Sequence, residues 1–93
     1  MYYIYTLFSS KLNRYYTGTT DNLERRLEEY NSKHYENAFT TKGIPWELML
    51  SYQCKSSDSA YTLEAFIKRM KSKKFIEKII ADQKIIIDIE SKL

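Results

Sequence analysis

YYIYTLFSSKLNRYYTGT, residues 2–19, carries the strongest structural signal in this chain. Residues 2–8 are mostly aromatic, β-branched or otherwise apolar, which favours a β-strand, and residues 15–19 favour a second strand. The polar residues 9–14 between them are typical of a turn. We therefore predict a β-hairpin at the start of the chain.

The pattern changes from strand to helix after the hairpin. Asp21 is a suitable N-cap residue, and Glu24 three positions later completes an arrangement typical of a capping box. We therefore expect a helix that begins after Asp21 and runs to about Lys33. Residues 34–42 are polar and lack a regular period, which is typical of a loop.

The expected helix has one apolar face. At about 100° per residue, Leu23, Leu27 and Tyr30 fall on the same side of the helix. Arg26 lies at the edge of this apolar stripe, whereas Arg25 points to the opposite side. Of the two arginines, Arg26 is therefore the one that we expect to be half-buried.

A third strand and a second long helix follow. Residues 45–52 are apolar enough for a strand at the centre of a sheet. Ser56, Ser57 or Asp58 can cap the next helix, in which Glu64 lies at the boundary of the apolar stripe. The stripe itself consists of Ala60, Leu63, Phe66, Ile67 and Met70.

The C-terminal part predicts more helix. Ser72 can begin a helix whose apolar side consists of Phe75, Ile76, Ile79 and Ile80. Residues 84–89 either extend that helix or form an edge strand, because short apolar runs fit both. The order strand–strand–helix–strand–helix–helix predicts an α+β fold with a small three-stranded antiparallel sheet flanked by helices. We expect one domain at residues 1–82, with a C-terminal extension at residues 83–93 that packs on it or trails from it.

Length and composition limit the function classes. A chain of 93 residues has room for one modest core. Its apolar runs are far shorter than a membrane span, and its N-terminus lacks the basic start of a signal peptide, so we expect a cytoplasmic protein with no membrane partner. One cysteine, Cys54, and one histidine exclude an intramolecular disulfide and a Cys/His zinc site.

Positive charge is concentrated in one segment of the sequence. The net charge is only +3, yet residues 68–78 (KRMKSKKFIEK) hold six Lys or Arg residues and one Glu. Such a run indicates a solvated helix face as readily as a nucleic-acid contact. Charge alone therefore does not assign a polyanionic partner.

Five short motifs together resemble the GIY-YIG nuclease superfamily. YIY at residues 3–5 and YTG at residues 16–18 resemble the two halves of the signature for which the superfamily is named. The other three motifs are NLERRL at residues 22–27, KGIPWEL at residues 42–48 and LEAFIK at residues 63–68. Each motif alone is weak, but their order and spacing extend the resemblance over about residues 2–80. The chain is most similar to the small, stand-alone bacterial members that consist of little besides this domain.

The resemblance implies a set of catalytic residues. In the superfamily these are the Tyr that closes the first motif, the Tyr that opens the second, an Arg on the first helix, often a His or Tyr one turn later, and a metal-binding Glu. Carried over to this chain, they are Tyr5, Tyr16, Arg26, Tyr30 and Glu64. Arg26 is preferred over Arg25 because its spacing from Tyr16 resembles that of repair-type members, and because the helical projection selects it independently.

These residue types suit phosphodiester cleavage. The resemblance implies Mg²⁺, with Mn²⁺ as an alternative, held by Glu64, and Mg²⁺ commonly uses one or two carboxylates while it keeps several waters. Arg26 offers a planar fork that matches phosphate oxygens. Tyr16 is the favoured general base, but a tyrosine ordinarily ionises only near about pH 10, so nearby positive charge is required, and Arg26 and the metal are its obvious sources. Tyr5 and Tyr30 are expected to support these groups.

Substrate-binding residues are expected around this set. Gly18 would let the backbone and a phosphate approach closely. Thr19 stands where some repair-type members carry a lysine, which leaves open what supplies positive charge beside Tyr16. Phosphate contacts are expected from the lysine-rich segment, at Lys68, Lys71, Lys73 and Lys74.

The leading hypothesis is a Mg²⁺-dependent endonuclease that acts on DNA rather than RNA, in DNA repair. We expect structure-directed or nonspecific cleavage rather than sequence-specific cleavage, with an activity that is weak or depends on a partner. The first alternative is a nucleic-acid-binding module that keeps the fold without catalysis. The second is an interaction module that forms a homodimer or binds another protein through apolar residues 85–89.

Overall fold

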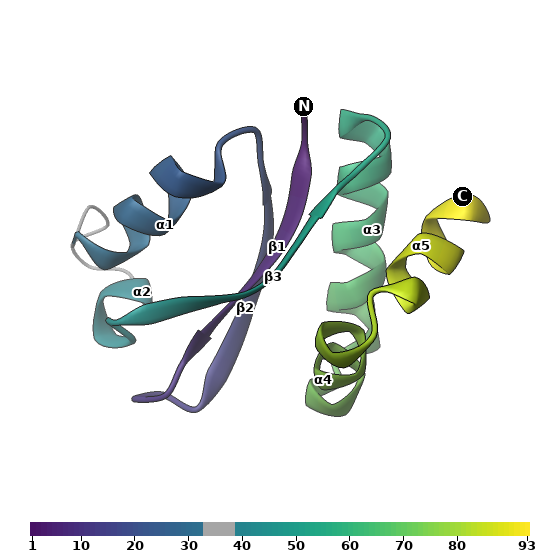
Figure 1. The fold of residues 1–93 in the computed structure, drawn as a ribbon. Helices are drawn as coiled ribbons and strands as arrows, with labels where there is room; N and C mark the ends of the chain where they lie inside the picture. Colours follow the sequence, from purple (N-terminus) through teal and green to yellow (C-terminus); the bar gives the residue numbers. More distant parts are fainter. Residues whose placement is uncertain (33–38) are drawn as a thin grey trace.

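The computed structural model describes residues 1–32 and 39–93, which form three layers (Figure 1). The middle layer is an antiparallel sheet of β1 (Tyr3–Ser9), β2 (Arg14–Thr20) and β3 (Trp46–Gln53). On one side of the sheet lie α1 (Leu23–Asn31) and the short α2 (Phe39–Lys42). On the other side lie α3 (Ser57–Met70), α4 (Lys73–Ala81) and α5 (Lys84–Ser91). The predicted α+β class and three-stranded antiparallel sheet are confirmed.

The strand order is β2-β1-β3, so β1 is the central strand. Tyr3 of β1 lies opposite Thr20 on one side and opposite Gln53 on the other. We expected the third strand to be central, and this prediction is wrong. Leu48 and Met49 of β3 are 39% and 40% exposed, so the apolar composition of this strand does not reflect burial on both faces.

Asparagine and serine side chains cap α1, α3 and α4. The N-cap of α1 is Asn22 rather than the expected Asp21, because the Asn22 side chain accepts a hydrogen bond from the backbone N–H of Arg25 at 3.0 Å. Asp21 instead forms an exposed ion pair with the Arg25 guanidinium at 3.2 Å. Ser56, one of the three expected candidates, caps α3, and Ser72 caps α4 as predicted.

Three segments differ in extent from the expectations. α1 ends at Asn31, whereas we expected it to run to about Lys33, which lies outside the described residues. Residues 34–38 of the expected loop also lie outside the described residues, and residues 39–42 form α2 rather than loop. The tail forms the separate helix α5 and not an edge strand, because α4 ends where Asp82 adopts an extended backbone.

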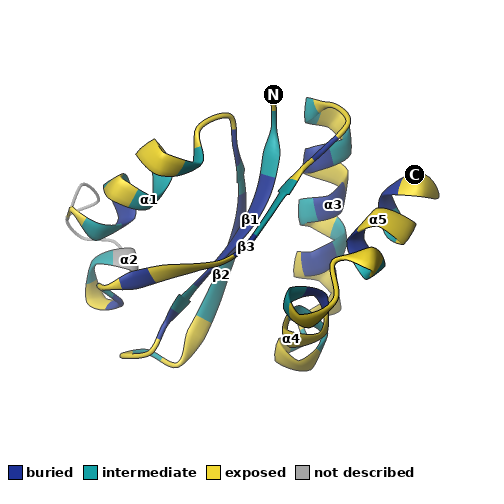
Figure 2. Cartoon of the chain, in the orientation of Figure 1, coloured by how far each residue is buried: buried dark blue, intermediate teal, exposed yellow. Residues whose placement is uncertain are grey.

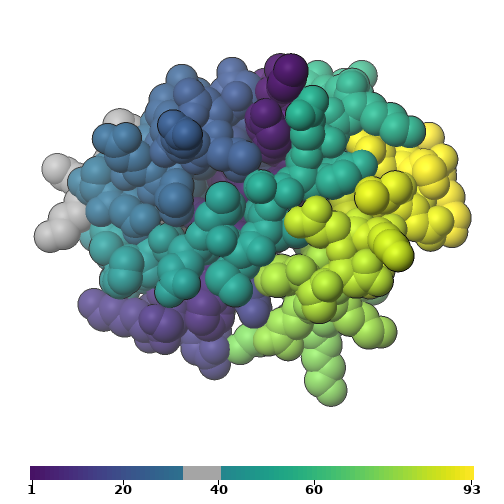
Figure 3. Space-filling view, in the orientation of Figure 1, coloured from purple at the N-terminus to yellow at the C-terminus, as the bar shows by residue number. Residues whose placement is uncertain are grey.

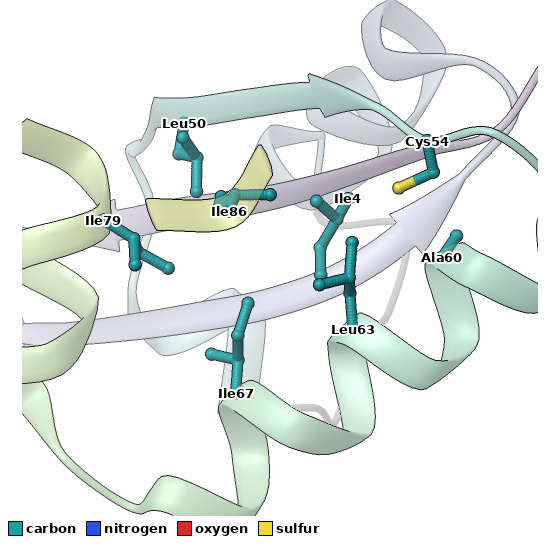
Figure 4. Close-up of a cluster of buried hydrophobic side chains, with 8 residues drawn as sticks. All are labelled: Ile4, Leu50, Cys54, Ala60, Leu63, Ile67, Ile79 and Ile86. Atoms are coloured by element: carbon teal, nitrogen blue, oxygen red, sulfur yellow. The ribbon is translucent and has the colours of Figure 1, made fainter. Parts of the chain in front are cut away.

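The larger core lies between the sheet and α3, α4 and α5 (Figure 4). Ile4 and Leu50 of the sheet pack there with Leu63 of α3, Ile79 of α4 and Ile86 of α5. All five side chains are at most 2% exposed. The C-terminal helices therefore complete the core that α3 begins.

The buried side of α3 faces the sheet (Figure 2). Ala60, Leu63 and Ile67 are buried, as the apolar stripe predicted. Phe66 is only half-buried, with its ring against that of Phe75 at a centroid distance of 6.0 Å. Met70, also expected in the stripe, is 46% exposed because it is the last residue of the helix.

Glu90 connects α5 to the end of β3 and the start of α3. Its carboxylate is 4% exposed and accepts hydrogen bonds from the Tyr52 hydroxyl, the Ser59 hydroxyl at 2.7 Å and the Lys55 backbone N–H at 2.9 Å. Ile86, one turn earlier, is fully buried. The apolar tail is thus used largely inside the protein.

Replacement of Glu90 should weaken the fold in a pH-dependent way. Burial alone would raise the pKa of the Glu90 carboxyl, but hydrogen bonds from Tyr52, Lys55 and Ser59 together hold that pKa below its ordinary value of 4.5. Such a carboxylate stabilises the folded state above the unfolded-state pKa, and this contribution is lost as the pH falls through the folded-state pKa. We expect Glu90→Gln to lower the free energy of unfolding by about 1–3 kcal/mol near pH 7. The difference from the parent should shrink at acid pH.

Urea unfolding followed by circular dichroism at neutral and acid pH measures both effects. Asp88→Asn is the matched control, because Asp88 lies on the same helix and its ion pair with Lys92 is exposed to solvent. Equal losses of stability in the two variants at neutral pH would contradict the role given to Glu90.

Candidate active site

Aromatic rings from four elements fill the space between the sheet and α1. The ring of Tyr30 in α1 meets those of Tyr5, Tyr16 and Trp46 edge-on, at centroid distances of 6.3, 5.4 and 6.0 Å. The electrostatics of aromatic rings favour this geometry. Tyr30 is only 5% exposed and is the centre of this aromatic cluster, which we define as Tyr5, Tyr16, Tyr30 and Trp46.

The two glycines of the chain make room for rings of this cluster. A Cβ atom on Gly18 would lie 2.5 Å from the Tyr5 hydroxyl oxygen, and one on Gly43 would lie 2.5 Å from Cζ2 of Trp46. Gly18 is also the register partner of Tyr5 across β1 and β2. The side chain of Tyr5 therefore crosses from the central strand over the edge strand, and this path requires glycine at position 18.

Two phenols of the cluster are buried and hydrogen-bonded to each other. The hydroxyl oxygens of Tyr5 and Tyr30 are 3.3 Å apart. Burial raises the pKa of Tyr5, although the hydrogen bond with Tyr30 and the charge of Arg26 oppose that rise. Burial also raises the pKa of Tyr30, and its interactions with Tyr5 and Tyr16 raise it further. Both phenols are therefore neutral at neutral pH.

Arg26 lies at the rim of the aromatic cluster. Its side chain is 34% exposed, compared with 60% for Arg25, which confirms the prediction from the helical projection. Arg26 is 3.5 Å from the carboxylate of Glu29 and acts electrostatically on the hydroxyl of Tyr5. The guanidinium is thus both near the tyrosines and accessible from solvent.

Glu64 and Lys68 approach the same tyrosines from the opposite side of the sheet. The Glu64 side chain is 21% exposed, and its Oε1 accepts a hydrogen bond from the Thr19 hydroxyl at 3.5 Å. Its Oε2 lies 2.7 Å from Nζ of Lys68. The same ammonium group lies 5.8 Å from the centroid of the Tyr16 ring. Lys68 therefore brings positive charge to Tyr16, the charge whose source the sequence left open.

A groove of about 680 Å³ opens beside Tyr16, between the β1–β2 hairpin and the junction of α3 with α4. Its cationic lining residues are Arg14, Lys68, Lys71 and Lys73. Lys74 is not part of the lining. The ammonium of Lys73 donates a hydrogen bond to Asn13 at 2.9 Å, and the hairpin tip and α4 lie side by side in Figure 3. The structure thus brings three of the four expected lysines to the groove and adds Arg14, which the sequence analysis did not select.

Asn31 is a second residue that the sequence analysis missed. Its Oδ1 accepts a hydrogen bond from the backbone N–H of Trp46 at 2.7 Å, and its Nδ2 donates to the Trp46 carbonyl at 3.0 Å. This pair of bonds holds the end of α1 against the first residue of β3. Asn31 therefore helps to position Tyr30 and Arg26 on the sheet. Its only sequence signal was a polar residue directly after Tyr30.

The donor atoms around Glu64 suit only certain metal ions. Among the residues that the structure describes, no three His, Cys, Asp or Glu side chains gather into a metal site. A single half-exposed carboxylate fits Mg²⁺ or Mn²⁺, because such an ion can keep several waters and share a phosphate oxygen of the substrate. It does not fit a structural zinc ion, which needs a closed set of nitrogen and sulfur ligands.

Gly18→Ala should disturb the aromatic cluster. The added Cβ would clash with the hydroxyl and Cζ of Tyr5, whose ring is buried and has little room to move. We expect a loss of about 1–3 kcal/mol in the free energy of unfolding, as for other overpacked cores. In the background of Tyr5→Leu, the same substitution should cost much less. Urea denaturation of the two single variants and the double variant measures this coupling, and additive losses would contradict the proposed contact.

Comparisons with known proteins agree with this geometry. The family model described as GIY-YIG catalytic domain matches residues 1–78. No curated protein and no solved structure matches the chain. In the described part of the chain, every helix is too short or too polar to cross a membrane. Because the family match spans both tyrosine motifs, the helix of Arg26 and the helix of Glu64, the chain belongs to the GIY-YIG catalytic domain family, a nuclease-type domain whose substrate is nucleic acid.

Proposed function

We propose that this protein is a Mg²⁺-dependent endonuclease that hydrolyses phosphodiester bonds in DNA, with Mn²⁺ as a substitute ion. The observation that carries the proposal is the meeting of Glu64, Lys68 and Tyr16 around the edge of β2, beside a cationic groove. A carboxylate for a metal, a cation for a phosphate and a phenol for a proton lie together there. These are the groups that phosphodiester hydrolysis needs.

Each residue has a separate task in this proposal. Arg26 holds the scissile phosphate, because its guanidinium can bind two phosphate oxygens at once. Tyr16 accepts the proton of the attacking water, since it is the tyrosine of the aromatic cluster that lines the groove. Tyr5 and Tyr30, which are buried, neutral and hydrogen-bonded to each other, support these groups, and the ring of Tyr30 packs against that of Tyr16.

The charge balance of the step follows from these tasks. In this step Tyr16 acts as a phenolate. The water oxygen forms a bond to phosphorus as one of its protons passes to the Tyr16 oxygen, and the bond from phosphorus to the 3′-side oxygen breaks, so that this oxygen leaves as an oxyanion. Arg26 compensates the charge that grows on the phosphoryl oxygens. Glu64, oriented by Thr19, would hold the divalent ion, which when bound stabilises the leaving oxygen as a Lewis acid.

The groove favours binding that does not depend on base sequence. Lys68, Lys71 and Lys73 present ammonium groups, which contact phosphates rather than base edges. Lys74, just outside the lining, adds to the same positive field. We therefore propose structure-directed or nonspecific cleavage. Gly18 and Thr19 do not line the groove; Gly18 leaves room for Tyr5, and Thr19 orients Glu64. Affinity should fall steeply as salt rises.

Three substitutions test the catalytic assignment. Tyr16→Phe, Arg26→Ala and Glu64→Gln should each reduce cleavage by about 100-fold or more, because each removes a group that acts in the transition state. The measurement is the initial rate on linear, nicked, branched and single-stranded DNA with Mg²⁺. Arg25→Ala is the matched control, since Arg25 is the exposed neighbour of Arg26 and should leave the rate unchanged.

The same panel separates the competing functions. Equal cutting by the parent and all three variants would indicate a contaminating nuclease and refute the assignment. Binding of DNA by the parent without cleavage of any substrate would support a non-catalytic binding module.

Lys68 should couple metal binding to DNA binding. Its ammonium occupies one oxygen of the carboxylate that we assign to the metal, and a phosphate in the groove would compete for it. Since the ion pair is partly exposed and worth at most about 1 kcal/mol, we expect Lys68→Met to raise the Mn²⁺ affinity of the free protein about two- to fivefold. DNA affinity should fall at the same time.

Calorimetric titration with Mn²⁺ measures the first effect, and fluorescence anisotropy of labelled DNA measures the second. Lys74→Met is the matched control, because Lys74 carries the same charge but does not line the groove. An unchanged Mn²⁺ affinity in Lys68→Met would contradict the coupling.

A further inference from the structure

The surface row of α3 that carries Glu64 and Lys68 continues in the other direction to Tyr61. At about 100° per residue, Tyr61, Glu64 and Lys68 fall within about 60° of one another around the helix. Tyr61 is 51% exposed, and the roles assigned above do not use it. A large aromatic side chain is therefore presented to solvent beside the Glu64 carboxylate.

Tyr61 is held in place by a second tyrosine. Its ring centroid is 5.8 Å from that of Tyr2 at an interplanar angle of 57°, and its hydroxyl donates a hydrogen bond to the Tyr2 hydroxyl at 3.5 Å. Tyr2 is half-buried and packs against the larger core. Because Tyr2 is anchored in this way, it limits the motion of the Tyr61 ring. Little ordering is then required when a flat ligand binds the exposed face.

The charge around Tyr61 differs from that of the groove. The groove at the C-terminal end of α3 is cationic, whereas Glu64 and Asp21 are the carboxylates that act electrostatically on the Tyr61 hydroxyl. A phosphate is not attracted to such a position, but the neutral face of a nucleobase is not repelled. Exposed aromatic side chains beside a cationic groove are a common means of binding unpaired bases.

The spacing suits a base close to the cleavage point. Tyr61 and Glu64 are three residues apart, which is about 4.5 Å along the helix axis. Successive stacked bases are separated by about 3.4 Å. A scissile phosphate that shares a divalent ion with Glu64 would therefore place a base of the same strand, one or two nucleotides away, over the Tyr61 ring.

We propose that Tyr61, backed by Tyr2, stacks on an unpaired base one or two nucleotides from the scissile phosphate. The substrate class is then single-stranded or locally unpaired nucleic acid, because a base inside a duplex has no free face to offer. The inference rests on the proposed function for the position of the scissile phosphate. It assigns a binding role to a residue outside the proposed catalytic set.

An abasic scan of a short single-stranded DNA tests this role without cleavage. Binding is measured by anisotropy with Ca²⁺ in place of Mg²⁺, so that Glu64 can still hold a divalent ion, and with a series of oligonucleotides that each lack one base. We expect Tyr61→Ala to bind the complete oligonucleotide about tenfold more weakly, and Tyr61→Phe to bind it nearly as well as the parent, because the ring is retained. Removal of one particular base should weaken DNA binding by the parent by a similar factor but leave binding by Tyr61→Ala unchanged.

Thr62→Ala is the matched control, since Thr62 is the exposed neighbour on another side of the helix. The stacking role is refuted if no abasic position weakens binding by the parent more than it weakens binding by Tyr61→Ala. It is also refuted if Tyr61→Ala weakens binding to fully paired duplex DNA by the same factor as binding to the single strand.

Cleavage by the parent with Mg²⁺ is scored separately. If loss of one base weakens DNA binding only when Tyr61 is present, but the parent cleaves no DNA, the nuclease assignment is refuted and stacking is supported. If the parent cleaves DNA but its affinity is the same for every abasic oligonucleotide, the nuclease assignment is supported and stacking is refuted.

Discussion

The free edge of β2 is the constraint on which the candidate site depends. The tyrosines and Arg26 lie on the α1 side of the sheet, whereas Glu64 and Lys68 come from α3 on the opposite side. Away from its edges, the sheet keeps these two sets of residues apart, because its backbone lies between the two layers of helices. Among the described residues β2 is an edge strand of the sheet, so Lys68 can reach the ring of Tyr16 around this edge. The central position of β1 is what leaves this edge open.

Glycine at position 18 lets a side chain of the central strand reach the same edge of the sheet. Tyr5 belongs to β1, yet its hydroxyl lies over β2, where any Cβ would block it. The ring is at the same time part of the aromatic cluster that joins α1 to the sheet. Burial keeps the phenols of Tyr5 and Tyr30 neutral, whereas Tyr16 lines the groove. One cluster thus serves both packing and the arrangement of the proposed chemistry.

The helix that carries Glu64 depends on residues beyond the family match. Ile79 and Ile86 are both fully buried in the core on the α3 side, and both lie after residue 78. Glu90 also accepts a hydrogen bond from the Ser59 hydroxyl in the N-terminal turn of α3. The C-terminal helices therefore support the position of α3 against the sheet. This support gives the buried isoleucines of the C-terminal helices a role in the fold.

The sequence by itself determined the local elements: the hairpin, the Ser72 cap, and the half-buried position of Arg26. It limited the cap of α3 to Ser56, Ser57 or Asp58. These depend on hydrogen bonding and periodicity within a few residues, which the order of side chains encodes directly. Only the tertiary structure decided that β3 is an edge strand and that Lys68 lies beside Tyr16. It also decided how Asn31 binds the backbone of Trp46. Such contacts join residues far apart in the chain, and they follow from strand pairing and side-chain reach, which no local pattern specifies.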